Sequence, residues 1–82
     1  KKITPLLITL QGESQTSKEH QERGVEKFLY VIDGEIKASV DKEQSILKTG
    51  ETLYFDASLP HQYSNEKAKP AKILLAVSPS KI

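Results

Sequence analysis

The sequence predicts an all-β domain folded as a single antiparallel barrel. Short apolar runs recur at intervals of roughly 8 to 12 residues, with turn-forming residues between them, which is typical of a barrel or sandwich. No stretch carries apolar residues at helical spacing over a useful length. The chain of 82 residues is long enough for one domain. A domain this small buries only about 60% of its unfolded surface, so a partner subunit would add to its stability.

The first half of the chain supplies two of the expected strands. Residues 3–10 form the first, and their early proline suits an edge position or a strand start. Residues 11–24 are polar and are expected to be a long loop or a solvated pair of strands. Residues 26–32 are apolar on both faces, so both faces are expected to be covered. Asp33 and Gly34 form the clearest turn, because glycine readily adopts a positive φ.

The second half continues the same pattern of short strands and tight turns. Apolar and polar residues alternate after Gly34, which places Ile36, Ala38 and Val40 on the core side. The remaining strands are expected at residues 35–40, 45–48, 51–55, 61–64 and 71–77. That gives about seven strands in one barrel.

Composition excludes several classes of function. The net charge of +1, with both signs interspersed, leaves no basic surface for nucleic acid. The chain has no cysteine, which excludes disulfides and thiolate zinc sites. No run approaches the roughly 20 apolar residues of a membrane span, and the start of the chain does not fit a signal sequence. We therefore expect no membrane contact and a cytoplasmic location. The lack of methionine indicates a piece of a longer protein.

The residues around His61 have an informative spacing. Five residues separate Gly50 from Asp56; Ser58, His61 and Asn65 then follow at intervals of two, three and four positions. This spacing resembles the second sequence motif of the cupin superfamily. Gly50, His61 and Asn65 match that motif, whereas Asp56 and Ser58 replace its proline and second glycine.

The first cupin motif is expected upstream of Gly34. Counting back from this glycine places His20 and Glu22 at the two histidine positions and Lys27 at the glutamate position. The resemblance to the superfamily covers residues 15–79. It implies a cupin-type double-stranded β-helix, also called a jelly-roll barrel.

The subgroup that the sequence resembles is the C-terminal sensor domain of helix-turn-helix (XRE-type) bacterial transcriptional regulators. The phrase "YFDASLPH", with Asp56 in place of proline, is characteristic of that subgroup. The resemblance implies that residues 1–82 are a single cupin domain and that a helix-turn-helix domain precedes it.

The resemblance also implies a site inside the barrel formed by His61, Lys27, His20 and Glu22. No metal is expected there, because the ammonium of Lys27 has three donors and no acceptor and would repel a dication. No other cofactor is expected. If a divalent transition metal is bound, His20, Glu22 and His61 would be its ligands, as two histidines and one carboxylate.

Simpler roles for the same residues stay open. His61 is either a ligand-binding group or a partly buried histidine bonded to Tyr63, Ser58 or the backbone. Lys27 is either an anion-binding group or a lysine paired with Glu22 or Glu26. Neither a nucleophile nor a paired carboxylate accompanies His61, so we name no catalytic residue.

The leading functional hypothesis is a ligand-sensing and dimerising regulatory domain of a transcriptional regulator. Its partners would be a small organic molecule, with an anion as one option, and a second copy of the chain. The first strand, with Leu6, Ile8 and Leu10 on one side, is expected to contribute to the dimer. The domain itself is expected not to contact DNA. The alternatives are a free-standing small cupin with metal-dependent activity of the dioxygenase or isomerase type, and a dimerisation barrel without a ligand.

Overall fold

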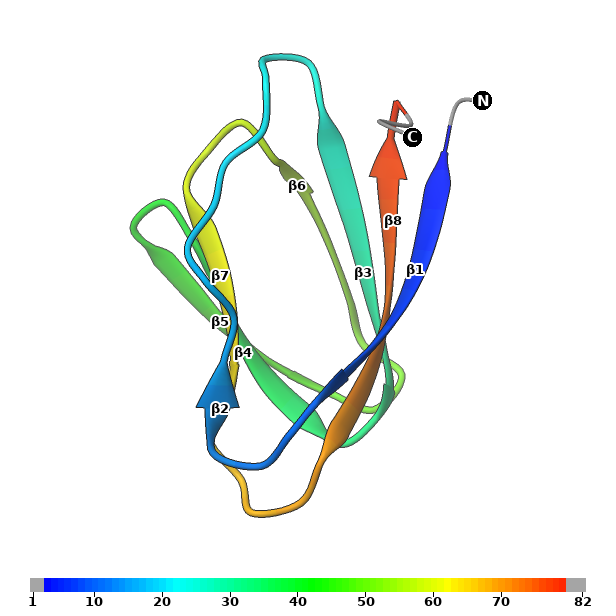
Figure 1. Ribbon diagram of the computed structural model, residues 1–82, viewed down its shortest axis with the longest axis vertical. Helices are drawn as coiled ribbons and strands as arrows, with labels where there is room; N and C mark the ends of the chain where they lie inside the picture. Colours follow the sequence, from blue (N-terminus) through cyan, green and yellow to red (C-terminus); the bar gives the residue numbers. More distant parts are fainter. Residues whose placement is uncertain (1–2, 80–82) are drawn as a thin grey trace.

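The computed structural model describes residues 3–79 and contains eight β-strands in that range (Figure 1). The strands are β1 (Thr4–Leu10), β2 (Ser14–Gln15), β3 (Glu26–Asp33), β4 (Glu35–Val40), β5 (Glu43–Lys48), β6 (Thr52–Asp56), β7 (His61–Asn65) and β8 (Ala71–Ser78). The described residues include no helix that could span a membrane.

The strands form two four-stranded antiparallel sheets that face each other across the core (Figure 1). One sheet has the order β1-β8-β3-β6 and the other has the order β2-β7-β4-β5. Eight strands divided between two facing sheets in this interleaved order are a jelly roll. The predicted all-β cupin-type barrel is therefore confirmed.

The number of strands differs from the sequence prediction by one. The polar segment 11–24 contains the additional strand β2, which pairs with β7 through Ser14 and Gln15. The strand β5 also begins two residues earlier than expected, at Glu43. Asp41 adopts a φ of 55°, so the β4–β5 hairpin closes with a shorter turn than the four residues predicted.

Gly34 marks the point where the chain passes from one sheet to the other. Its φ of +103° lies in the left-handed region that favours glycine. A Cβ atom at this position would lie 2.9 Å from the Cβ of Ala71, so the close approach also requires glycine. The Thr49 hydroxyl accepts a hydrogen bond from the Gly34 amide at 2.9 Å. The predicted turn is present, but it joins two sheets instead of forming a hairpin.

The core lies between the inner faces of the two sheets. On β3 the inward residues alternate with outward ones, and Leu29 and Val31 are fully buried. The outward side chains of Phe28, Tyr30 and Ile32 are 36–39% exposed. The prediction that both faces of this strand are covered is therefore wrong for the single chain. Its outer face is apolar but open to solvent.

Asn65 fastens the β7–β8 connection to the end of β1. Its amide nitrogen donates hydrogen bonds to the carbonyl oxygens of Leu10 at 3.1 Å and Lys69 at 2.7 Å. Its amide oxygen accepts a hydrogen bond from the backbone of Lys67 at 3.0 Å. Asn65 is 1% exposed, so this part of the second motif has a structural role in positioning the chain.

Candidate functional site

The site is built on the inner face of β7 and the adjacent part of β3. His61, Tyr63 and Asn65 are all buried, because alternate residues of β7 point into the barrel. Lys27 points inward from β3 in the opposite sheet and is 3% exposed. The fold therefore brings one cation from the first motif against the histidine of the second.

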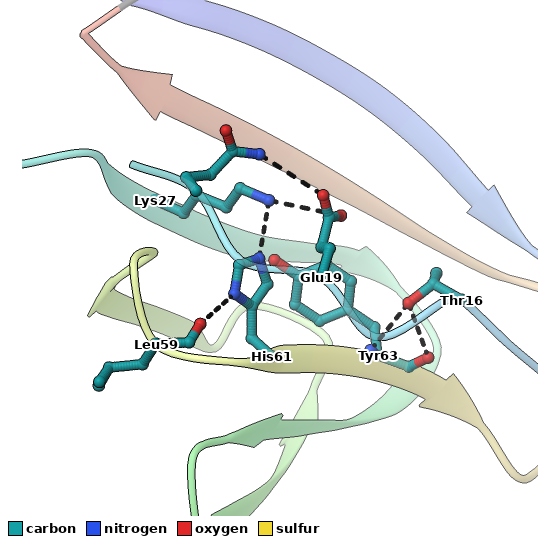
Figure 2. Close-up of polar contacts among 7 residues, drawn as sticks. Thr16, Glu19, Lys27, Leu59, His61 and Tyr63 are labelled. Atoms are coloured by element: carbon teal, nitrogen blue, oxygen red, sulfur yellow. Dashed lines mark hydrogen bonds and ion pairs between the residues drawn. The ribbon is translucent and has the colours of Figure 1, made fainter. Parts of the chain in front are cut away.

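A segment formed by residues 16–21, here called the strap, runs along β7 and covers one side of the site (Figure 2). The amide of Thr16 donates to the carbonyl of Tyr63 at 2.9 Å. Glu19 and His61 exchange two backbone hydrogen bonds, at 2.8 and 3.0 Å. The strap is thus held by its backbone, while the side chains of Thr16, Glu19 and Gln21 face the barrel interior.

Lys27 and His61 are in direct contact, with 2.9 Å between Nζ and Nε2 (Figure 2). An ammonium group can only donate, so Nε2 is the acceptor of this hydrogen bond. The other ring nitrogen, Nδ1, donates to the carbonyl oxygen of Leu59 at 2.8 Å. Both ring nitrogens are engaged, and this arrangement requires a neutral imidazole protonated on Nδ1.

The charge of Lys27 is balanced by Glu19 of the strap. Its Nζ lies 3.6 Å from Oε2 of Glu19, and the glutamate side chain is 47% exposed. Gln21 donates a long hydrogen bond of 3.5 Å to the other carboxylate oxygen. A buried cation is costly without a partner, so this carboxylate at the edge of the site stabilises the buried lysine.

A cavity of about 260 Å³ opens beside this ion pair. Its polar end is formed by Lys27, Glu19 and Tyr63. Its apolar walls come from β1 and β8, through Leu6, Ile8, Leu75 and Val77. The volume is just below the range of about 300–1,000 Å³ that is usual for small-molecule sites, so a ligand would have to be small.

The hydroxyl group of Tyr63 has no hydrogen-bond partner among residues 3–79 although it is buried. Figure 2 shows this end of the ring directed toward Lys27 and His61. Burial raises the pKa of Tyr63, and the negative charge of Glu19 adds to the effect. The group is therefore a neutral donor whose hydrogen bond is unused. Unpaired buried polar groups are rare and costly, which indicates a site for a further partner.

The four residues predicted for the site are only partly brought together. Lys27 lines the cavity, and His61 lies directly behind it and holds its ammonium group. Whether these two residues bind a ligand stays a prediction. The simpler role of His61, a backbone-bonded buried histidine, is also realised through Leu59.

His20 and Glu22 are placed differently from the prediction. Both are exposed, and neither lines the cavity. The strap instead directs Glu19 and Gln21 toward it. Gly24 has a φ of +92° in the turn between the strap and β3, so strand alternation cannot be counted back through this turn. This corrects the inward placement of two of the four residues.

The described residues do not fit a metal. Within residues 3–79 no group of three or more His, Cys, Asp or Glu side chains is close enough to hold an ion. The alternative ligand set of His20, Glu22 and His61 is not assembled as a group of three, and the first two residues are exposed. The Nε2 of His61 accepts a hydrogen bond from Lys27, which places a cation where a metal would bind.

The neutral His61 makes stability depend on pH. Burial lowers the pKa of His61 below its ordinary value of about 6.5, and the charge of Lys27 lowers it further. Below pH 6.5 the unfolded chain then binds more protons at this residue than the folded chain. We expect the free energy of unfolding to be level above pH 6.5 and to fall below it, by at most about 1.4 kcal/mol per pH unit.

Urea unfolding between pH 5 and 8 measures this dependence. The His61→Gln variant should lose most of the slope below pH 6.5. The sequence has only two histidines, and His20→Gln at the exposed one is the matched control, which should keep the slope. A slope that persists in His61→Gln would contradict the assignment.

An antiparallel jelly roll with an inward-facing histidine on β7 and a cavity between its sheets defines a small pocket-containing barrel. The chain belongs to the cupin family, because residues 6–77 match its cupin domain model. The tetracenomycin polyketide synthase protein TcmJ of Streptomyces glaucescens is 32% identical over 68 residues, which are 83% of this chain and 44% of that protein. The chain thus spans less than half the length of this curated relative.

Solved structures of cupin domains are closely similar. The cupin domain of an XRE family transcriptional regulator from Enterobacter cloacae has a TM-score of 0.89 and 25% identity, covering 98% of this chain and 84% of that one. An HTH_3 family transcriptional regulator from Vibrio cholerae has a TM-score of 0.86 and 24% identity, covering 96% and 44%. A sugar phosphate isomerase from Silicibacter pomeroyi has a TM-score of 0.83 and 21% identity, covering 98% and 52%. The last two likenesses concern the fold alone.

Proposed function

We propose that this chain is the ligand-sensing and dimerising cupin domain of a transcriptional regulator. The observation that carries the proposal is the cavity whose polar end combines the buried Lys27 with the unpaired hydroxyl of Tyr63. A ligand that prefers one arrangement of the barrel would shift the population of the whole regulator toward it. In this proposal a helix-turn-helix domain precedes the chain, contacts DNA in its place, and works in the cytoplasm.

The similarity to the cupin domain of the Enterobacter cloacae regulator supports this proposal, because it covers 98% of this chain and 84% of that one. The alternative is a metal-dependent enzyme, a class consistent with the fold likeness to the isomerase. Lys27 argues against it, because its ammonium occupies the acceptor atom of His61 that would bind a metal.

Recovery of the natural ligand distinguishes a sensor from an enzyme. The purified chain is incubated with an extract of small molecules from a bacterium, washed by rapid gel filtration, and examined by native mass spectrometry. We expect a small molecule that is released chemically unchanged and that binds at equal strength after chelator treatment. Conversion of the molecule, or a need for metal, would favour the enzyme. A chain that retains no molecule at all would favour the ligand-free dimerisation barrel.

The surface proposed for the dimer is the outer face of the sheet β1-β8-β3-β6. Cross-strand register places Leu7 beside Leu74, Leu74 beside Tyr30, and Phe28 beside Tyr54, so their side chains form one apolar patch. Leu7 is 69% and Tyr54 is 65% exposed. A second copy of the chain is the proposed occupant, because a barrel this small gains from burying further apolar surface.

The structure changes the part that β1 would play in such a dimer. Leu6 and Ile8 line the cavity and Leu10 belongs to the core, so these three residues face the interior. The outward residue of β1 in the apolar patch is Leu7. The proposed dimer therefore uses Leu7 in place of Leu6, Ile8 and Leu10, and a contribution of the first strand to a dimer stays a prediction.

Lysine substitution in the patch should dissociate the dimer. Sedimentation equilibrium at micromolar concentration should give twice the chain mass of 9.2 kDa for the parent and about the chain mass for Leu7→Lys. A charge placed in the middle of an apolar interface is costly to desolvate. Ile46→Lys is the matched control, because Ile46 is 51% exposed on β5 of the other sheet. A monomeric parent, or a dimer that only Ile46→Lys dissociates, would contradict the proposed surface.

A further inference from the structure

The polar end of the cavity offers two hydrogen-bond donors that the chain itself does not satisfy. The ammonium of Lys27 has three N–H groups. One is donated to Nε2 of His61, and the nearest carboxylate oxygen of Glu19 lies at 3.6 Å, beyond hydrogen-bond distance. The hydroxyl of Tyr63 is also without an acceptor among the described residues. Two unused donors at one end of the cavity suit a ligand with two acceptor atoms.

We infer that the cavity binds a singly charged carboxylate that carries a short apolar body, an inference that rests on the proposed small-molecule sensing function. One carboxylate oxygen accepts from Lys27 and the other accepts from Tyr63. The apolar body lies among Leu6, Ile8 and Leu75, which line the walls. Glu19 occupies the place of the ligand anion when no ligand is bound.

The charges around the cavity determine how many negative charges the ligand carries. Lys27 is the only lysine, arginine or histidine side chain that lines the cavity in the described part of the chain. His61 adds no charge and no free donor, because both of its ring nitrogens are engaged. A phosphate dianion would therefore bring a second negative charge without a counterion, which is costly away from water. An amine would be repelled by Lys27, and a neutral alcohol would offer it a weaker hydrogen bond than a carboxylate does.

Glu19 competes with such a ligand for the same cation. Lys27 is 3% exposed and cannot leave the site, whereas the Glu19 side chain is already 47% exposed and can turn into water. Ligand binding would then replace the ion pair between Lys27 and Glu19 with one between Lys27 and the ligand. The Glu19 carboxylate would be released into water. Removing the charge of Glu19 should therefore strengthen binding, and removing that of Lys27 should weaken it.

The probes are hexanoate, 1-hexanol and hexylammonium, which share one apolar body and differ in the head group. Each is titrated into the intact chain, and amide chemical shifts in NMR spectra give the dissociation constants. We expect hexanoate to bind with a Kd of about 1 mM or tighter. We expect it to bind at least about tenfold more tightly than the other two, because a hydrogen bond to a charged partner is worth that much.

Three variants test the individual contacts. Lys27→Met should weaken hexanoate binding by about tenfold or more, and Tyr63→Phe should weaken it by roughly three- to tenfold. Glu19→Gln should strengthen it by about threefold or more, because a competing charge is lost. Tyr63→Phe is the decisive variant: its hydroxyl has no partner within the described chain, so the change should not lower the free energy of unfolding while affinity falls.

Each outcome either supports or overturns the inference. Hexanol binding as tightly as hexanoate would overturn the carboxylate assignment but leave the proposed sensing function standing. Unchanged hexanoate affinity in Tyr63→Phe, or weaker binding in Glu19→Gln, would also overturn it. If none of the three compounds binds, the carboxylate inference is wrong, and the extract experiment then judges the proposed function on its own.

Discussion

Replacing Asn65 with aspartate should lower the free energy of unfolding by about 3 kcal/mol. The amide nitrogen donates to the carbonyl oxygens of Leu10 and Lys69. A carboxylate has no donor, so the change leaves two carbonyls without this partner and places a negative charge against them. Each buried polar group that loses its partner costs about 1–3 kcal/mol. The aspartate can still accept the hydrogen bond from the Lys67 amide, but this bond recovers little of the cost.

Urea unfolding at pH 7 measures the effect, with all variants at one protein concentration because association changes apparent stability. Gln44→Glu is the matched control: it makes the same change from amide to carboxylate at an exposed position on β5. Surface substitutions of this kind usually stay within about 0.5 kcal/mol. A loss in Asn65→Asp no larger than that of the control would show that the hydrogen bonds of Asn65 do not fasten the β7–β8 connection.

The fold could be predicted because its signals are local. Residues 35–40 alternate along the strand, and the observed strand β4 has the same bounds. For residues 11–24 the sequence left a loop and a solvated pair of strands open, because the two residues of β2 are polar and pair only with β7. For the outer face of β3 the sequence signal was present, but its meaning was not visible in the single chain. An apolar face in the sequence indicates that something covers it, but the single chain leaves Phe28 and Tyr30 partly exposed.

The site could be predicted only where the spacing stayed within one element. Asn65 and His61 share β7, so their register was reliable, and Tyr63 lies between them with the same inward alternation. That alternation is the signal by which Tyr63 could have been recognised as a pocket residue. Glu19 could not be found in this way, because the turn at Gly24 interrupts the alternation before the strap.

The departures from the second motif also have a local explanation. Asp56 accepts hydrogen bonds from the amide of Ser58 at 3.0 Å and from its hydroxyl at 2.7 Å. The two residues that replace proline and glycine thus form a turn together, in which a side chain takes the place of a backbone acceptor. The motif therefore keeps its length and leads His61 into the barrel, although two of its residues have changed.

Replacing Lys27 with histidine should convert the cation site into a metal site. The Nζ of Lys27 lies 2.9 Å from Nε2 of His61 and 3.6 Å from Oε2 of Glu19, so its position is already within reach of two ligand atoms. An imidazole is shorter than a lysine side chain and leaves room for an ion between its nitrogen and that of His61. The variant would then offer two histidines and one carboxylate, a set that suits divalent transition metals.

We expect Lys27→His to bind Zn²⁺ or Ni²⁺ on the order of a hundredfold more tightly than the parent, because it removes a repelling charge and adds a ligand. Isothermal titration calorimetry on chelator-treated protein measures the affinity, and elemental analysis measures the metal retained. Lys27→Met is the matched control: it removes the charge without adding a ligand and should gain little. The double variant Lys27→His/Glu19→Gln should bind metal more weakly than Lys27→His by at least roughly 10–100-fold. Loss of an outer-shell partner already costs that much, and Glu19 would be a direct ligand. A parent chain that already retains one equivalent of transition metal would contradict this account, because Lys27 could not then be the group that keeps metal out.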